Sequence, residues 1–144
     1  MHASAQKGQG VVDKVLSRLK KETARIDGES SEAHKNALKM TATFDENYKG
    51  TAVIDGKTGK AIFGPKFLNP SASSEMSVEI TKFFNALSTS DKQLFVMRHE
   101  LGHMSQRNLS LQRDYRFEGR SLPRYRRDFE IDATERTFEF MRGL

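Results

Sequence analysis

The 144-residue sequence contains no cysteine, no tryptophan and only three prolines. Without cysteine the chain can form neither a disulfide nor a thiolate metal site, so a metal would have to be bound by histidines and carboxylates. The sequence also lacks an apolar run of about 18 residues, so we expect no membrane span. The N-terminus has no apolar core of the kind found in signal peptides, and the localisation therefore stays open.

Length and composition predict a single domain over residues 1–144. Hydrophobic residues make up 36% and charged residues 30% of the chain, which is enough for one modest core but not for two. Residues 1–9 are expected to be a flexible leader. They look like the cut edge of a longer natural chain.

Apolar periodicity predicts four helices. The first is an amphipathic helix over residues 10–26. A short helix within 78–87 is expected to pack under the sheet, and a proline-free helix follows at 90–107. A last helix covers 128–142. The segment 108–127 between the last two has weak periodicity and is predicted to be an irregular crossing loop.

The strands are expected in the first half of the chain. After a polar loop at 28–35, apolar and polar residues alternate from Leu38 to Phe44, which is typical of a half-buried strand. Thr51–Ile54 and Ala61–Phe63 flank a glycine-containing turn and predict a β-hairpin. We therefore expect a small antiparallel sheet in an α+β domain, with the segment 61–68 at the sheet edge because of its proline.

The net charge of +5 and the pI near 9.6 come largely from one arginine cluster. Its arginines are interleaved with aromatic residues, a pattern that can bind nucleic acid through phosphate contacts and stacking. Acidic residues interrupt the run, so the favoured interpretation is a charged surface loop. The cluster comprises Arg113, Arg116, Arg120, Arg124, Arg126 and Arg127.

The most informative stretch is His99-Glu100-Leu101-Gly102-His103, inside the helix predicted at 90–107. Two histidines four positions apart project from one helix face and can bind one divalent ion. Glu100 lies beside such an ion rather than pointing at it. That is the place for a general base that takes a proton from a metal-activated water.

These five residues resemble the signature of the zincin metallopeptidases. The resemblance implies a minimal zincin-like domain with one zinc ion per chain, in which a metal-activated water hydrolyses a peptide bond. It also implies that an extended substrate pairs with the sheet edge beside the metal helix, for which 61–68 is the candidate. Gly102 inside a helix predicts a close approach of another backbone.

A catalytic zinc ion needs a third protein ligand and one position open to water. His2 and His34 are expected in loops, so the last helix is the better source. On its helical wheel Glu130 can face inward, whereas Asp132 is expected to face outward. Asp132 is the second choice, and Asp114 or Asp128 would also supply an aspartate ligand.

The residues Glu130-Ile131-Asp132-Ala133 are similar to the second signature of zincins with a glutamate ligand, in which alanine follows three residues after the glutamate. The match implies that Glu130 is the ligand and that Ala133 lets the two helices approach. The family often has aspartate at the next position as a partner for a ligand histidine, and this chain has Thr134. A hydroxyl can accept the same hydrogen bond more weakly.

The leading hypothesis is a zinc-dependent metallopeptidase acting on a protein or peptide, with Glu100 as general base. A donor for the oxyanion is expected from the crossing loop, where Tyr125 is chosen over Tyr115 and Arg124. The small size and the cut N-terminal edge resemble C-terminal toxin modules of bacterial secreted effectors. That resemblance implies delivery by a secretion system and an immunity protein as partner.

Two other functions fit the sequence. One is a zincin-like binding module with a structural metal, whose basic loop holds nucleic acid or an acidic protein. The other is a metal-dependent amidase that acts on a bond other than a peptide bond. Glu100 distinguishes a hydrolase from the binding module, because a structural metal site has no use for a base between its histidines.

Overall fold

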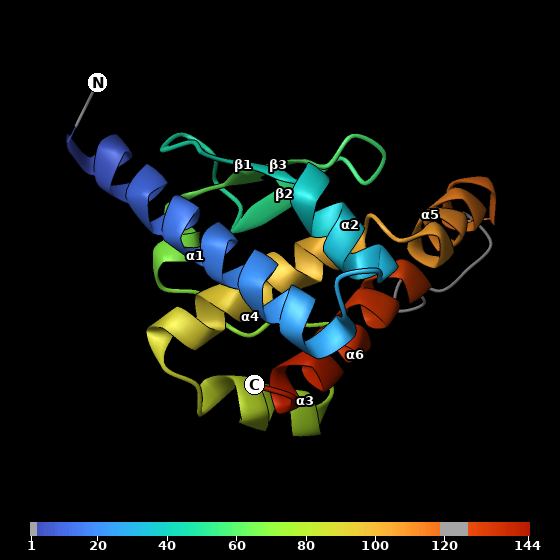
Figure 1. The fold of residues 1–144 in the computed structure, drawn as a ribbon. Helices are drawn as coiled ribbons and strands as arrows, with labels where there is room; N and C mark the ends of the chain where they lie inside the picture. Colours follow the sequence, from blue (N-terminus) through green and yellow to red (C-terminus); the bar gives the residue numbers. More distant parts are fainter. Residues whose placement is uncertain (1–2, 119–126) are drawn as a thin grey trace.

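The computed structural model describes residues 3–118 and 127–144. These residues form an α+β fold, which confirms the fold class expected from the sequence. Figure 1 shows the sheet at one side of the molecule and α4 running through its middle. The elements in chain order are α1 (Ala3–Asp27), α2 (Glu32–Lys39), β1 (Thr41–Phe44), β2 (Ala52–Ile54), β3 (Lys60–Phe63), the 3-10 helix η1 (Pro65–Leu68), α3 (Val78–Asn85), α4 (Thr89–Gly102), α5 (Gln106–Glu118) and α6 (Asp128–Arg142).

Helix α4 contacts at least five other elements of the fold. Its N-cap is Ser88, whose hydroxyl accepts a hydrogen bond from the main-chain N–H of Asp91. Leu94, Phe95 and Met97 are buried, and the helix contacts α1, α2, α6 and β2. Burial on several sides fixes both the position and the rotation of α4, and so fixes the directions of its polar side chains.

Helices α4 and α6 come unusually close at one point. A Cβ atom added to Gly102 would lie 3.2 Å from the Cβ of Ala133. The close approach predicted for Gly102 and the role predicted for Ala133 are therefore both confirmed. Small residues on both helices bring the end of α4 against the start of α6.

The sheet is mixed, so the predicted antiparallel arrangement is wrong. Its strand order is β1-β3-β2, with β1 parallel to β3 and β2 antiparallel to β3. The hairpin of β2 and β3 is confirmed. The place of β1 depends on α1, since Gln9 accepts a hydrogen bond from the N–H of Phe44 at 2.7 Å and donates one to the carbonyl of Ala42 at 3.2 Å.

The edge-strand prediction is also wrong. Residues 61–63 belong to the central strand β3, and the following proline starts η1 instead of extending a strand. Because α1 covers the outer side of β1, the free edge of the described sheet is that of β2. Strand β2 also contacts α4.

Three helical predictions need correction. Helix α1 begins at Ala3, so residues 3–9 are helical where a flexible leader was expected. The expected loop at 28–35 ends in α2, which is capped by Ser31, and the first strand begins only at Thr41. The helix predicted at 90–107 ends at Gly102, and a separate helix, α5, covers residues 106–118, where an irregular loop was expected from residue 108 onward. Each segment is polar and gives little apolar periodicity.

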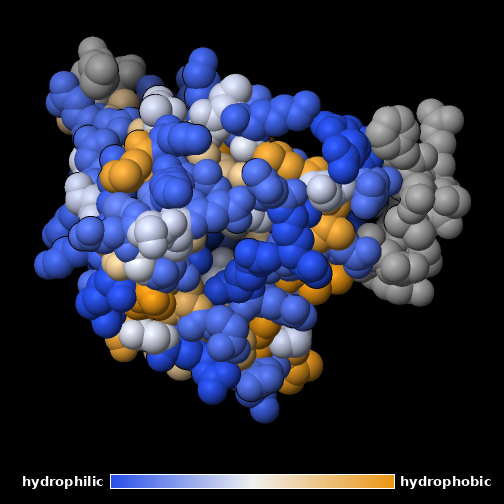
Figure 2. All heavy atoms as spheres, turned by 45° about the vertical axis from the view of Figure 1, so that its right-hand side comes forward, coloured by the Kyte–Doolittle hydropathy of each residue, from blue (hydrophilic) through white to orange (hydrophobic). Residues whose placement is uncertain are grey.

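Helix α3 lies at the end of α4 and α6, not under the sheet (Figure 1). The ring of Phe84 packs edge-on against Phe95 of α4, and that of Phe83 packs against Phe138 of α6. On the face seen in Figure 2, hydrophobic side chains form small separate patches among hydrophilic ones. In the part of the chain that the structure describes, no helix has the length and apolar character needed to cross a membrane.

Candidate metal centre

His99, His103 and Glu130 come together between α4 and α6. The Nε2 atoms of the two histidines are 3.3 Å apart. Oε1 of Glu130 lies 3.5 Å from Nε2 of His99 and 2.7 Å from Nε2 of His103. One donor atom from each residue thus lies within 4.8 Å of the others, and the three form a group that could hold a metal ion.

The second ring nitrogen of each histidine has its own partner. Nδ1 of His99 lies 3.2 Å from the hydroxyl of Thr134, the contact expected from the sequence. Nδ1 of His103 lies 2.9 Å from Oδ1 of Asn108. When Nδ1 donates to these oxygens, each Nε2 atom is left to bind a metal ion or, when it is protonated, to donate to Glu130.

Asn108 is the main site residue that the sequence did not reveal. It is fully buried, and its side-chain amide donates to the carbonyl of Phe129 at 2.7 Å and to Oδ2 of Asp132 at 2.9 Å. These two acceptors fix the orientation of the amide, so its oxygen must face His103. No spacing rule places this residue, because it lies beyond the end of α4 in a segment predicted to be irregular.

Asp132, the second choice for the third ligand, has a different role. Its carboxylate accepts hydrogen bonds from Arg107 at 3.1 Å and from Arg136 at 3.0 Å, in addition to the one from Asn108. It therefore supports His103 through Asn108 and does not face the two Nε2 atoms.

The remaining candidate ligands do not join the centre. Asp114 and Asp128 are exposed. His34 belongs to α2, where its Nδ1 atom contacts the carbonyl of Glu29 at 3.0 Å. His2 lies outside the described residues. Among the residues that the structure describes, Glu130 is thus the carboxylate that meets the two histidines.

Two of the three donor separations match those of a zinc site. Tetrahedral zinc with bonds of about 2.0–2.1 Å to nitrogen and oxygen separates its ligand atoms by about 3.3 Å. The separation of the two Nε2 atoms, 3.3 Å, and that of His99 and Glu130, 3.5 Å, agree with this spacing. The third separation, 2.7 Å, is a hydrogen-bond distance.

The charges of the centre also suit a cation. Burial alone would raise the pKa of Glu130, but hydrogen bonds with His103 and His99 outweigh it and hold the pKa well below its usual value. Burial lowers the pKa of His103, but the hydrogen bond with Glu130, the charges of Glu100 and Glu130 and the contact with Asn108 together outweigh burial and raise it. Glu130 is therefore ionised. A proton on His103 competes with a cation, so metal binding releases a proton.

Glu100 lies beside the centre and is buried at 9% exposure. Burial raises the pKa of its carboxyl group, and the neighbouring histidines only partly offset this effect. Among the described residues no hydrogen-bond donor engages this carboxylate, and it lines a cleft together with His103 and Glu130. A carboxylate with a raised pKa and no fixed partner is suited to accept and release a proton.

The cleft has a volume of about 260 Å³ and one wall formed by β2. In the ladder of β2 and β3, the main-chain N–H of Asp55 donates to the carbonyl of Lys60, and that of Gly64 donates to the carbonyl of Thr51. The pair of Val53 and Ile62 lies midway between these two hydrogen-bonded pairs. Because hydrogen-bonded and non-hydrogen-bonded pairs alternate in an antiparallel ladder, the main-chain polar groups of Ala52 and Ile54 point away from β3. The free edge of β2 is thus available beside Glu100.

Tyr125 and Arg124, considered as oxyanion donors, lie outside the described residues. The ring of Tyr115 packs against that of Phe129 with centroids 5.2 Å apart. The cleft is instead lined by Gln112 and Arg127. The guanidinium group of Arg127 forms an ion pair with the carboxylate of Glu75 at 3.3 Å.

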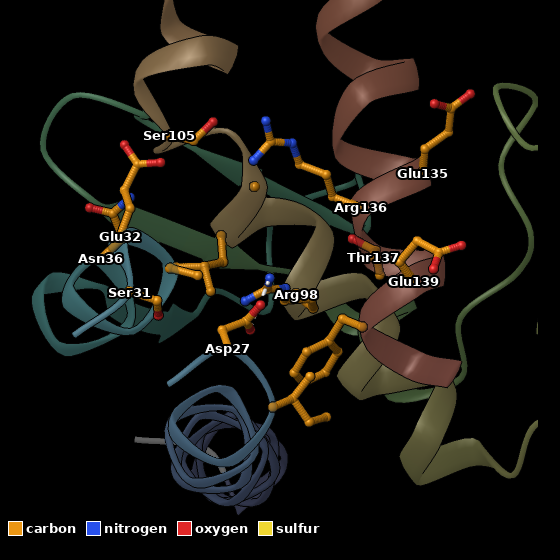
Figure 3. Close-up of a pocket in the computed structure, with 15 residues that line it drawn as sticks. Asp27, Ser31, Glu32, Asn36, Arg98, Ser105, Glu135, Arg136, Thr137 and Glu139 are labelled. Carbon is orange, nitrogen blue, oxygen red and sulfur yellow. Dashed lines mark ion pairs between the residues drawn. The ribbon is translucent and has the colours of Figure 1, made fainter. Parts of the chain in front are cut away.

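A larger cavity of about 650 Å³ lies between α4, α6, α2 and the end of α1. Figure 3 shows the side chain of Arg98 directed at Asp27 within it. Its other arginine, Arg136, pairs with Asp132. Among the described residues, the group of side chains that could hold a metal is the one at His99, so this cavity is not the metal site.

Replacing Asn108 with alanine is expected to weaken zinc binding by about 10- to 100-fold, because the ring of His103 loses the acceptor that fixes its orientation. Zinc affinity can be measured by competition with a chromophoric chelator, and folding by circular dichroism. Asn85→Ala, at an exposed position of α3, is the matched control. Unchanged zinc affinity in a folded Asn108→Ala protein would contradict the role of Asn108.

Comparison of the chain with protein-family models, with curated proteins and with solved structures finds no match.

Proposed function

We propose that this chain is a zincin-type metallopeptidase that hydrolyses peptide bonds of a protein substrate. The observation that carries the proposal is the convergence of His99, His103 and Glu130 from two helices, with the buried Glu100 beside them in a cleft. His99, His103 and Glu130 would hold the ion. A bound zinc ion supplies a Lewis acid that polarises a carbonyl group and lowers the pKa of water.

Glu100 is the group that moves the proton. Its carboxylate would accept a proton from the attacking water and pass that proton to the leaving amine. A structural metal site would need the same three ligands but no buried carboxylate between the histidines. The position of Glu100 therefore favours a hydrolase over a binding module.

The free edge of β2 supports a peptide rather than a small molecule as substrate. An extended peptide that pairs with Ala52 and Ile54 would gain main-chain hydrogen bonds and lie across the cleft next to Glu100. Arg127 at the cleft wall offers N–H donors for the oxyanion that forms when the carbonyl is attacked. Its pairing with Glu75 holds it at that wall.

The function can be tested with a mixture of denatured proteins as substrate. The zinc-loaded protein is expected to create new N-termini that are absent with the Glu100→Gln variant and absent after a chelator has removed the metal. Activity should return when zinc is added back to the chelated protein. Cleavage that persists without metal, or an unchanged set of termini in every sample, would contradict the proposal.

A further inference from the structure

A second groove lies between the β2–β3 hairpin and α5, and we call it the hairpin groove. It has a volume of about 580 Å³ and is lined chiefly by Val53, Ile62, Leu109, Lys57, Lys60 and Arg116. No step of the proposed reaction uses these side chains. We call the three apolar residues of this set the floor of the groove and the three basic residues its rim.

The floor exposes aliphatic side chains to solvent. Val53 and Ile62 are opposite each other on the two strands and are 44% and 39% exposed. Leu109 of α5 is half-buried beside them. Paired, exposed β-branched residues next to a leucine give an apolar surface that gains free energy when a partner covers it.

The rim carries a net positive charge. Lys57, Lys60 and Arg116 are exposed, and Asp55 is the acidic residue that lines the same groove. Oδ1 of Asp55 already accepts hydrogen bonds from the main-chain N–H groups of Lys57 and Thr58, at 2.9 and 3.3 Å. The rim thus attracts acidic groups and disfavours basic ones.

The hairpin groove is continuous with the cleft at the metal centre. Val53, Ile54 and Gln112 line both. Both sides of the groove lie against the end of α4. Gln112 of α5 donates a hydrogen bond to the carbonyl of His103 at 3.0 Å, and a Cβ atom added to Gly56 of the hairpin turn would overlap the same oxygen. A chain that lies along β2 from the cleft therefore leads into the groove.

We propose that the hairpin groove binds a segment of the protein substrate away from the cleaved bond, one in which acidic residues flank an aliphatic side chain. This inference rests on the proposed function, and it adds a substrate class to it. Continuity with the cleft points to the substrate rather than to another partner. Nucleic acid is disfavoured because the floor is aliphatic, whereas bases stack on aromatic side chains.

The test uses the zinc-loaded Glu100→Gln protein, so that binding is measured without turnover. Three fluorescein-labelled peptides of equal length serve as probes: acidic residues around one isoleucine, lysines around the same isoleucine, and acidic residues around a serine. Fluorescence anisotropy is expected to give an affinity for the first peptide at least about tenfold higher than for either of the others. The first peptide should also shift the methyl resonances of Ile62 and Leu109.

Lys60→Glu and Arg116→Glu, introduced together into the Glu100→Gln protein, are expected to abolish the preference for the first peptide. Lys14→Glu with Lys82→Glu makes the same change in charge at exposed sites on α1 and α3 and should leave this preference intact. Equal binding of the three peptides, tighter binding of a single-stranded oligothymidylate, or methyl shifts confined to other residues would overturn the proposal. Selective binding without any hydrolysis by the wild type would contradict only the proposed reaction. Hydrolysis without selective binding would contradict only the role of the groove.

Discussion

Replacing Glu100 with glutamine is expected to reduce the rate of peptide-bond hydrolysis by about 10²- to 10⁴-fold, the range found when a general base is removed. Glutamine has nearly the same shape as glutamate but cannot accept the proton of the attacking water. Since Glu100 is not among the three residues whose donor atoms converge, zinc content should remain near one ion per chain. Hydrolysis can be followed by the release of fluorescence from a labelled casein.

Glu135→Gln is the matched control, because Glu135 is exposed on α6 and the change in charge is the same. Its rate should equal that of the wild type. If Glu100→Gln kept the wild-type rate while binding zinc, Glu100 would have a structural role only. If it lost both zinc and activity, the assignment of Glu100 as a base rather than a ligand would fail.

Replacing Glu130 with alanine is expected to weaken zinc binding by more than about 100-fold, because loss of a ligand costs more than loss of a residue that orients one. The effect extends to stability. A ligand present at 1,000 times its dissociation constant raises the free energy of unfolding by about 4 kcal/mol. Zinc should therefore raise the melting temperature of the wild type much more than that of Glu130→Ala.

Asp132→Ala separates the two candidates for the third ligand. Asp132 contacts Asn108 and two arginines, not the histidine Nε2 atoms, so its loss should weaken zinc binding less than the loss of Glu130. Calorimetric titration of both variants with zinc gives the comparison. The reverse order of effects would mean that the last helix presents the wrong carboxylate to the histidines.

The faces on which the candidate ligands lie were predictable because they depend on local spacing. His99 and His103 are one helical turn apart, and Glu130 lies in a long helix with strong periodicity, so the sequence determines the face on which each residue lies. The contact between Gly102 and Ala133 follows from small residues in the same two helices. Convergence of these helices nevertheless depends on packing, which the sequence indicates only through the family resemblance.

The sheet and the short helices were harder to predict for physical reasons. Alternation identifies a strand but not its neighbour, so the place of β1 beside β3 was settled by contacts with α1. Helix α2 buries only Ala37, and its N-terminus is capped by Ser31. Helix α5 has no strong apolar stripe. Such helices depend on capping and tertiary contacts more than on periodicity.

This difference explains why Asn108 was missed. Its position is defined by the turn between α4 and α5 and by acceptors on α6, so three elements must be placed before its contact with His103 can be seen. The same holds for the edge of β2, which becomes available only because β3 takes the centre of the sheet. Residues that support a site are harder to predict than the residues that form it.

The most direct test of the central claim is anomalous diffraction at the zinc absorption edge from crystals of the zinc-loaded protein. We expect one anomalous peak bound by Nε2 of His99, Nε2 of His103 and a carboxylate oxygen of Glu130, with a water molecule in the fourth position facing Glu100. A peak at another group of residues, or a fourth protein ligand in place of the water, would contradict the account.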